Sequence, residues 1–163
     1  MATVPTIRAA AAADLDEIRA LFREYAAGLD FSLCFQDFDR EVAALPGKYA
    51  PPAGRLLIAE IDGRIVGAIA MRALDAEACE MKRLYVRDVA RGSGAGRALA
   101  ERLVAEAKAA GYRVMRLDTL RDRMAAANRL YESLGFRDIP PYYHNPLEGV
   151  RYMELDLAAV VAS

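Results

Sequence analysis

The residues with the clearest chemical potential are three glycines that stand where a helix is expected to begin. The segment RGSGAG, residues 91–96, lies between a β-like run, residues 79–86, and a helical pattern, residues 97–108. Glycines at a helix start leave backbone N–H groups exposed and let a ligand approach closely. These N–H groups and the helix dipole together favour an anion, most simply a phosphate. The spacing therefore predicts a site for a phosphorylated cofactor.

Two common phosphate-binding motifs do not fit these glycines. The dinucleotide fingerprint G-x-G-x-x-G fails because Arg97 or Leu99 stands at the place of its last glycine. The nucleoside triphosphate loop requires a lysine after its last glycine, and none follows Gly96. The pattern that fits is R-x-x-G-x-G directly before a helix. A glycine-rich turn without a ligand is the competing interpretation, since glycine clusters are common in turns.

The elements that must position this loop follow from the hydrophobic pattern. Asp14 and Glu17 occupy capping-box positions for a first helix, and Gly28 and Gly135 each follow a helical run as a stop signal. The mixed order of strands and helices predicts an α/β (α+β) fold or a mixed sheet with helices on both faces. We expect strands at residues 4–8, 56–61, 65–71, 79–86, 114–119 and 150–157, and helices at 14–27, 31–45, 97–108 and 124–134.

Length and charge limit the class of protein. The chain has 163 residues, enough to bury a core, and we expect one domain over residues 1–163. Its 22 basic and 23 acidic side chains give a formal net charge of −1. This balance predicts neither a nucleic-acid partner nor a membrane partner.

The cysteines, the histidine and the apolar runs exclude further classes. Cys34 and Cys79 lack the spacing of a metal site or of a disulfide framework, and His144 is the single histidine. We therefore expect no metal. The sequence has no recognisable secretory signal and no apolar run near the roughly 18 residues that span a bilayer. These features predict a cytoplasmic protein.

Three motifs together carry a resemblance to a known family. They are EMKRLYV at residues 80–86, RGSGAG at residues 91–96 and LYESLGF at residues 130–136. With them the chain resembles the GCN5-related N-acetyltransferase (GNAT) superfamily, small single-domain bacterial-type members in particular. The resemblance covers residues 56–157, while residues 1–55 match by element order alone. The R-x-x-G-x-G and L-Y-x-x-x-G-F motifs are specific as a pair and weak separately.

The resemblance implies a fold and a cofactor. The fold is a mixed, mostly antiparallel sheet of six to seven strands, splayed between the fourth and fifth strands and flanked by about four helices. Acetyl-CoA would lie in the split, its pyrophosphate on the amides of residues 91–96 and its pantetheine arm along residues 84–86, like an added strand. An N–H near Leu84 would stabilise the oxyanion. The implied cofactor-binding residues are Leu84, Tyr85, Val86, Arg91, Gly92, Ser93, Gly94, Ala95, Gly96, Arg97 and Asn128.

One position departs from the family pattern. Many members carry an asparagine seven residues before the helix tyrosine, where it bonds the cofactor or the loop. Met124 stands there in this chain, and Asn128 follows one turn later. A side-chain hydrogen bond to the pantetheine from this point is therefore in doubt, whereas the pyrophosphate cradle is unaffected.

Acetyl transfer to an amine requires one group to remove a proton from the amine and another to protonate the departing thiolate. By resemblance, Tyr131 matches the tyrosine near the sulfur and is the candidate acid; the competing interpretation is a tyrosine that simply packs. Glu80 is the candidate base. The period of a strand is expected to put residues 80, 82, 84 and 86 on one face. The competing interpretation is a glutamate paired with a nearby lysine or arginine, such as Arg83 or Arg116. In that case a water chain, or no dedicated base, would take its place.

The acceptor site is the least determined part. We expect Phe31, Tyr142, Tyr143, His144 and Asn145 to line it, with His144 alternatively an exposed loop residue. A carboxylate-binding pocket for an amino-acid-like acceptor is a further option, against the ordinary interpretation that scattered arginines are solvated. Its members would be Arg83, Arg116, Arg121, Arg123 and Arg151.

The predicted function is direct transfer of the acetyl group of acetyl-CoA to a primary amine of a small molecule through a ternary complex. Two alternatives stay open: acetylation of a protein lysine or N-terminus, and a non-catalytic acyl-CoA sensor. A homodimer is compatible with the apolar last strand at residues 150–157.

Overall fold

The computed structural model describes residues 4–29, 37–122 and 124–159. In these residues a single seven-stranded sheet has the order β1-β2-β3-β4-β5-β7-β6. The β4–β5 pair is parallel, and every other neighbouring pair of the described sheet is antiparallel. The strands are β1 (Thr6–Ala9), β2 (Arg55–Ile61), β3 (Arg64–Ala73), β4 (Ala78–Val86), β5 (Val114–Leu120), β6 (Arg137–Ile139) and β7 (Val150–Asp156).

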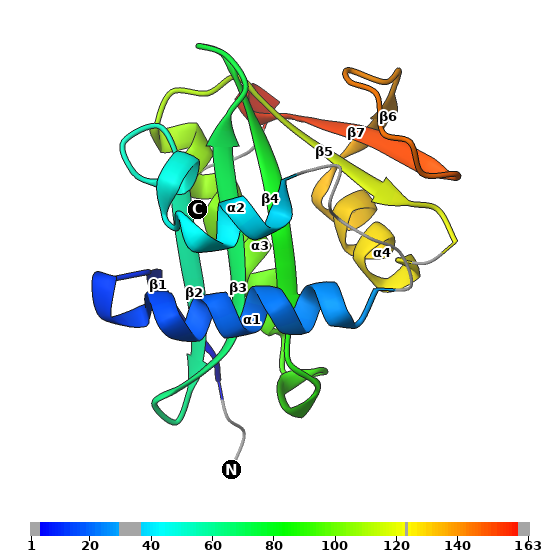
Figure 1. Ribbon diagram of the computed structural model, residues 1–163. Coiled ribbons are helices and arrows are strands. Elements are labelled where there is room, and N and C mark those ends of the chain that lie inside the picture. Colours follow the sequence, from blue (N-terminus) through cyan, green and yellow to red (C-terminus); the bar gives the residue numbers. More distant parts are fainter. Residues whose placement is uncertain (1–3, 30–36, 123, 160–163) are drawn as a thin grey trace.

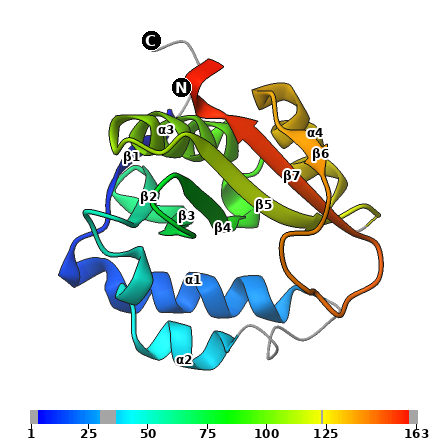
Figure 2. The same cartoon turned by 90° about the horizontal axis from the view of Figure 1, so that it is seen from above.

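Helices cover both faces of the sheet and create two cores (Figure 2). Helices α1 (Leu15–Ala27) and α2 (Phe38–Ala43) lie on one face, where Phe22 and Tyr49 are fully buried. Helices α3 (Ala95–Ala109) and α4 (Ala125–Leu134) lie on the other. None of the helices within the described ranges combines the length and the apolarity needed to cross a bilayer.

The sheet opens between β4 and β5. The two strands pair only through Ala78↔Val114, Cys79↔Met115 and Glu80↔Arg116, although both continue further. Beyond these pairs, residues 81–86 of β4 and 117–120 of β5 have no register with each other. Figure 1 shows β5 turning away from β4. The mixed, mostly antiparallel sheet splayed between the fourth and fifth strands, as predicted, is confirmed.

A β-bulge reverses the side-chain alternation of β4. Lys82 lies opposite Ala70 and Tyr85 opposite Ala68, so two residues, Arg83 and Leu84, occupy the space of one. Arg83 has a φ of 62°, a conformation rare outside glycine. After the bulge, Leu84 packs with Val86 against the α3 core, whose β4 members are the odd-numbered Cys79 and Met81. The predicted common face for residues 80, 82, 84 and 86 is therefore wrong.

An ion pair holds this bulge in place. Arg83 is buried and donates from Nε and Nη2 to the two carboxylate oxygens of Glu41 in α2, at 2.9 and 3.1 Å. Its guanidinium also lies 5.2 Å from the ring centroid of Phe38. Side-chain contacts to α2 thus offset the backbone strain at one strand position.

Local expectations at the helix ends and in the last hairpin need correction. The Asp14 side chain makes no capping bond to α1; it accepts from the Ala11 amide at 2.7 Å and from Arg8. Glu17 forms no capping box and pairs with Arg87 at 2.7 Å. The helix predicted at residues 31–45 corresponds to α2, which spans Phe38–Ala43. Residues 44 and 45 form a turn, and residues 31–36 lie outside the described part of the chain. Strand β6 was missed because three residues with two charges make no periodic pattern.

The helix ends give a test of backbone conformation. Gly135 follows α4 with a φ of 102°, whereas Gly28 follows α1 with a φ of −79°. Because left-handed backbone is costly for a residue with a Cβ, we expect Gly135→Ala to lower the free energy of unfolding by about 1–2 kcal/mol. Gly28→Ala is the matched control and should be neutral or slightly stabilising. Urea unfolding measures both, and equal effects would contradict this account.

Candidate active site

A cavity of about 650 Å³ lies in the split of the sheet. Its walls come from both diverging strands, from the start of α3 and from α4. The lining includes residues 81–86, 117–120, 94–96 and 124–127, together with Tyr25, Ala90, Arg91, Gly92, Leu130, Tyr131, Asn145 and Leu147. A cavity of this size accommodates a cofactor-sized ligand.

The glycine loop at one end of the cavity presents a specific set of free amides. The Arg91 and Ser93 N–H groups are used within turns, donating to the carbonyls of Asp88 and Ala90 at 3.2 and 3.0 Å. The Ala95 N–H donates to the Ser93 hydroxyl at 3.3 Å. Among the described residues no acceptor is found for the N–H groups of Gly92, Gly94, Gly96 and Arg97.

Two glycines of the loop are required for its conformation. Gly92 and Gly94 have φ values of 84° and 87°, and a Cβ at either position would meet no atom within 4 Å. The requirement is therefore conformational rather than steric. With α3 beginning at Ala95, the loop aims unpaired amides and the positive helix end at the cavity. This geometry fits a phosphate group.

The open edge of β4 forms a second binding element. Residues 81–86 pair with β3 on one side and have no partner strand on the β5 side. Leu84, Tyr85 and Val86 all line the cavity. Their backbone groups on the open side can pair with an extended ligand as an added strand does.

Tyr131 contributes the one tyrosine hydroxyl of α4 to the cavity wall. Its side chain is buried, and its ring lies 5.8 Å from that of Phe136. Burial raises the pKa of Tyr131, so the phenol is protonated at neutral pH. No hydrogen bond joins its hydroxyl to another described residue. A protonated hydroxyl facing a cavity is suited to donate a proton.

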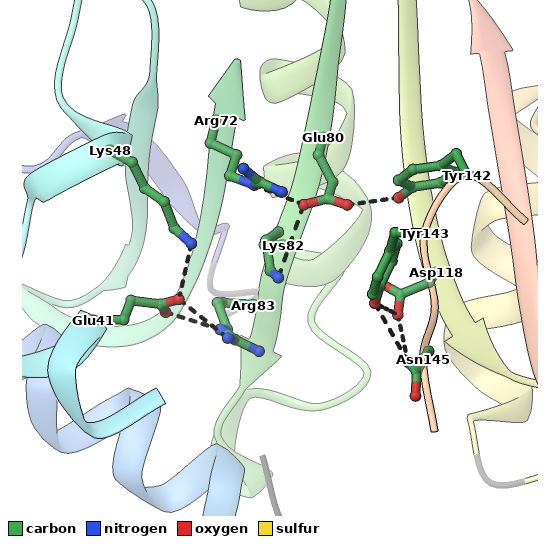
Figure 3. A network of polar contacts seen from close by, with 10 residues as sticks. All are labelled: Glu41, Lys48, Arg72, Glu80, Lys82, Arg83, Asp118, Tyr142, Tyr143 and Asn145. Carbon is green, nitrogen blue, oxygen red and sulfur yellow. Dashed lines mark hydrogen bonds and ion pairs between the residues drawn. The ribbon is translucent and has the colours of Figure 1, made fainter. Parts of the chain in front are cut away.

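Glu80 lies beside the cavity, not on its wall. It is 1% exposed, and both its oxygens are engaged (Figure 3). Oε1 accepts from Arg72 at 2.9 Å and lies 3.8 Å from Lys82 Nζ, while Oε2 accepts from the Tyr142 hydroxyl at 2.6 Å. The structure thus contains a glutamate paired with an arginine and a lysine, as the competing interpretation expects. The two arginines given as examples, Arg83 and Arg116, pair instead with Glu41 and Glu154.

Asp118 is a carboxylate that sequence analysis missed. It lies on β5 beyond the last pair with β4 and lines the cavity. Its Oδ2 accepts from the Tyr143 hydroxyl and from Asn145 Nδ2, the latter at 2.8 Å. No described residue donates to Oδ1. The only sequence signal is a single acid among the apolar residues that end a strand.

The loop before β7 brings three of the predicted acceptor residues together. Tyr142 and Tyr143 contact each other and Tyr152, with ring centroids 5.4–5.7 Å apart. Asn145 lines the cavity, whereas the two tyrosines do not. Tyr143 bonds Asp118 on the cavity wall, and Tyr142 bonds Glu80 beside it. His144 is exposed. Phe31 lies outside the described residues.

Other predicted residues lie at the margin of the cavity. Asn128 does not line it; its Nδ2 donates to the carbonyls of Leu120 and Arg121 at 3.0 and 3.3 Å. The Arg97 side chain donates to the Ser133 hydroxyl at 2.7 Å. Of the five arginines considered for a carboxylate pocket, Arg83 lines the cavity, and Arg123 lies outside the described residues.

Comparisons with known proteins agree with this geometry. The sequence pattern of the Acetyltransferase (GNAT) family matches residues 15–136. An uncharacterized N-acetyltransferase of Schizosaccharomyces pombe is 41% identical over 147 residues, 89% of this chain and 90% of that protein. The N-acetylaspartate synthetase of Rattus norvegicus is 37% identical over 109 residues, 66% of this chain but only 35% of that protein.

Solved structures show the same fold. An acetyltransferase of Salmonella typhimurium, determined with its cofactor acetyl-CoA, has a TM-score of 0.73 and 25% identity and covers 98% of this chain and 97% of its own. In our structure the unpaired amides, the open β4 edge and the cavity between them fit a phosphorylated cofactor with an extended arm. The chain belongs to the GNAT acetyltransferase family and is an acetyl-CoA-dependent N-acetyltransferase.

Proposed function

We propose that this enzyme transfers the acetyl group directly to a primary amine of a small molecule, within a ternary complex. The observation that carries the proposal is a single cavity with a proton donor and a proton acceptor on its walls. Tyr131 contributes a hydroxyl and Asp118 an unpartnered carboxylate oxygen. With both groups at one cavity, amine and thioester can react without a separate acyl-enzyme step.

The cofactor would be held by backbone groups. When bound, acetyl-CoA supplies an activated acetyl thioester. The amides of residues 92, 94, 96 and 97 would bind the diphosphate, and residues 84–86 would pair with the pantetheine arm. The Leu84 N–H, beside the bulge, would donate to the acetyl oxygen.

Asp118 would receive the amine. An ammonium group must lose a proton before it can attack, and Oδ1 of Asp118 is a free acceptor at the cavity. Tyr143 and Asn145 would hold the carboxylate in orientation through Oδ2. The base role of Glu80 stays a prediction, and the engagement of both its oxygens favours Asp118 over it. Tyr131 would then protonate the departing thiolate.

A small-molecule acceptor is supported by the names of relatives. One is the N-acetylaspartate synthetase of Rattus norvegicus, and another is an IAA acetyltransferase of Azospirillum brasilense, 40% identical over 95 residues. Thiol release measured with a panel of small amines tests this proposal. We expect at least one amine to give a kcat/KM of about 10⁴ M⁻¹ s⁻¹ or more. Acetylation of peptides only would contradict it.

Gly94 provides a test of the phosphate site. Asp and Asn both tolerate left-handed backbone, so Gly94→Asp and Gly94→Asn differ mainly in charge. We expect the Asp variant to bind coenzyme A at least about tenfold more weakly than the Asn variant, because its carboxylate repels the diphosphate. Isothermal calorimetry measures both affinities. Equal affinities would place the diphosphate elsewhere.

Tyr131→Phe tests the proton donor. The variant keeps the ring contact with Phe136 and removes only the hydroxyl. We expect kcat to fall by about 10²- to 10⁴-fold while the affinity for coenzyme A stays within about twofold. Steady-state thiol release and calorimetry give the two numbers. Undiminished turnover would remove Tyr131 from the mechanism.

Asp118→Asn and Glu80→Gln together decide which carboxylate takes the proton. Both are isosteric changes that keep an oxygen for the tyrosine donors. We expect Asp118→Asn to lower kcat/KM by about 10²-fold or more, and by at least about tenfold more than Glu80→Gln does. The comparison uses the best amine of the panel. A larger effect at Glu80 would restore its predicted role.

A further inference from the structure

The cavity in the split has walls on both faces of the sheet. Leu84 and Val86 of β4 pack with the core on the α3 side. Tyr85 of β4 and Tyr25 of α1 pack with the core on the α1 side. All four residues line the cavity, and Figure 2 shows α1 and α3 on opposite faces of the sheet. The cavity therefore extends through the sheet, from the glycine loop at the start of α3 to the side that α1 covers.

The proposed cofactor would use the α3 side of this space. Its diphosphate would lie on the amides of the glycine loop, and its arm would follow the open edge of β4. Its thioester would lie near Tyr131, whose side chain belongs to the core on the α3 side. The α1 side of the cavity is then left for the acceptor, so the residues there determine which acceptor fits.

Two tyrosine rings form a corner on the α1 side of the cavity. Of the residues described in α1 and α2, Tyr25 alone lines the cavity, and it contacts Tyr85. The ring centroids are 6.0 Å apart and the ring planes are inclined at 69°, an edge-to-face arrangement that aromatic rings prefer. Both residues are only partly buried. A third aromatic ring would cover their remaining surface and extend the same packing.

The charged side chains that precede Tyr85 on β4 are paired within the protein. Glu41 accepts from Nε and Nη2 of Arg83 at 2.9 and 3.1 Å, and Nζ of Lys82 lies 3.8 Å from Oε1 of Glu80. A ligand group that meets this wall therefore finds compensated charges and uncharged aromatic surface. Such a surface favours an apolar substituent, because burying it removes apolar area from water and leaves no polar group unpaired.

Tyr25 also lies near Asp118, the proposed acceptor of the proton. Burial raises the pKa of Tyr25; the Arg83 guanidinium opposes this rise, and the Asp118 carboxylate adds to it. The phenol is therefore uncharged at neutral pH. Because Tyr25 and Asp118 line one cavity, a short carbon chain can link an amine held at Asp118 to a group that lies against the tyrosine rings.

We infer that Tyr25 and Tyr85 determine acceptor specificity, and that the acceptor is an amine that carries an aromatic group on a short chain. This inference rests on the proposed small-molecule function and names its substrate class. The amine would lie at Asp118 and the aromatic group in the corner of the two tyrosines. Tyr25 and Tyr85 would act on acceptor binding, while Asp118 and Tyr131 would handle the protons.

Matched amines test the inference on the unaltered enzyme. The aromatic members are phenethylamine, tryptamine and benzylamine; ethylamine is the counterpart without the ring for the first two, and methylamine for the third. Thiol release with saturating acetyl-CoA gives kcat and KM separately. For at least one aromatic amine we expect a KM about 10- to 100-fold lower than that of its counterpart, because burying a phenyl-sized group is worth about this factor.

Variants of Tyr25 assign the preference to its ring. In Tyr25→Leu we expect the KM of the preferred aromatic amine to rise about tenfold while that of its counterpart stays within about twofold, because the ring contact is lost. Tyr25→Phe keeps the ring against Tyr85 and should retain most of the preference. Tyr112→Leu removes a tyrosine that bonds the Ala53 carbonyl outside the cavity, and this matched control should keep the preference.

The outcomes separate this inference from the proposed function. If the unaltered enzyme acetylates small amines but uses both members of each pair equally, or prefers the member without the ring, the inference is wrong and the function stands. Failure of every small amine to release thiol would overturn the inference together with the proposed function. The comparison on unaltered enzyme remains decisive even if a Tyr25 variant does not fold.

The variants can overturn the inference in three further ways. An equal rise of KM for both members in Tyr25→Leu would assign the ring a purely structural role. An equal loss of preference in Tyr25→Phe and Tyr25→Leu would assign the preference to the hydroxyl. A Tyr25→Leu protein that binds coenzyme A at least about tenfold more weakly in calorimetry, with its amine preference intact, would place the ring in the cofactor site.

Discussion

The site depends on the point where the parallel pairing of β4 and β5 ends. After Glu80 and Arg116 the strands diverge, so backbone groups that a closed sheet would satisfy internally are left facing a cavity. Buried backbone groups need partners, and an extended ligand in the split can supply them. The proposed sites of the cofactor arm, of the proton donor on α4 and of the proton acceptor on β5 all depend on this opening.

The bulge at Arg83 gives the open strand two different surfaces. Regular alternation would have put Lys82 and Leu84 on one face; the extra residue turns Leu84 toward the α3 core and leaves Lys82 and Arg83 together on the other side. The Glu41 carboxylate from α2 stabilises the arrangement from outside the sheet. One strand thereby combines an open backbone edge with charged side chains at the cavity.

The loop before β7, which carries Tyr142, Tyr143 and Asn145, gives two carboxylates different environments. Tyr142 bonds the second oxygen of Glu80, which then has no oxygen without a partner. Tyr143 and Asn145 both bond Oδ2 of Asp118 and leave Oδ1 without a donor among the described residues. Hydrogen bonding from the same loop thus makes Glu80 an anchor between strands and Asp118 a candidate reactive group. This difference is the basis of the proposed proton path.

By itself, the sequence determined the glycine loop, most element positions and the family motifs, because these depend on local conformational preferences and on residue periodicity. Gly94 and Gly135, for example, adopt the left-handed backbone that glycine permits. Only the tertiary structure decided the bulge at Arg83, the partners of Glu80 and the position of Asp118 on the cavity wall. The Tyr142–Glu80 bond joins residues 62 positions apart, and the Arg83–Glu41 pair joins residues 42 apart. Contacts at such separations arise from the packing of whole elements, which no local pattern of residue types encodes.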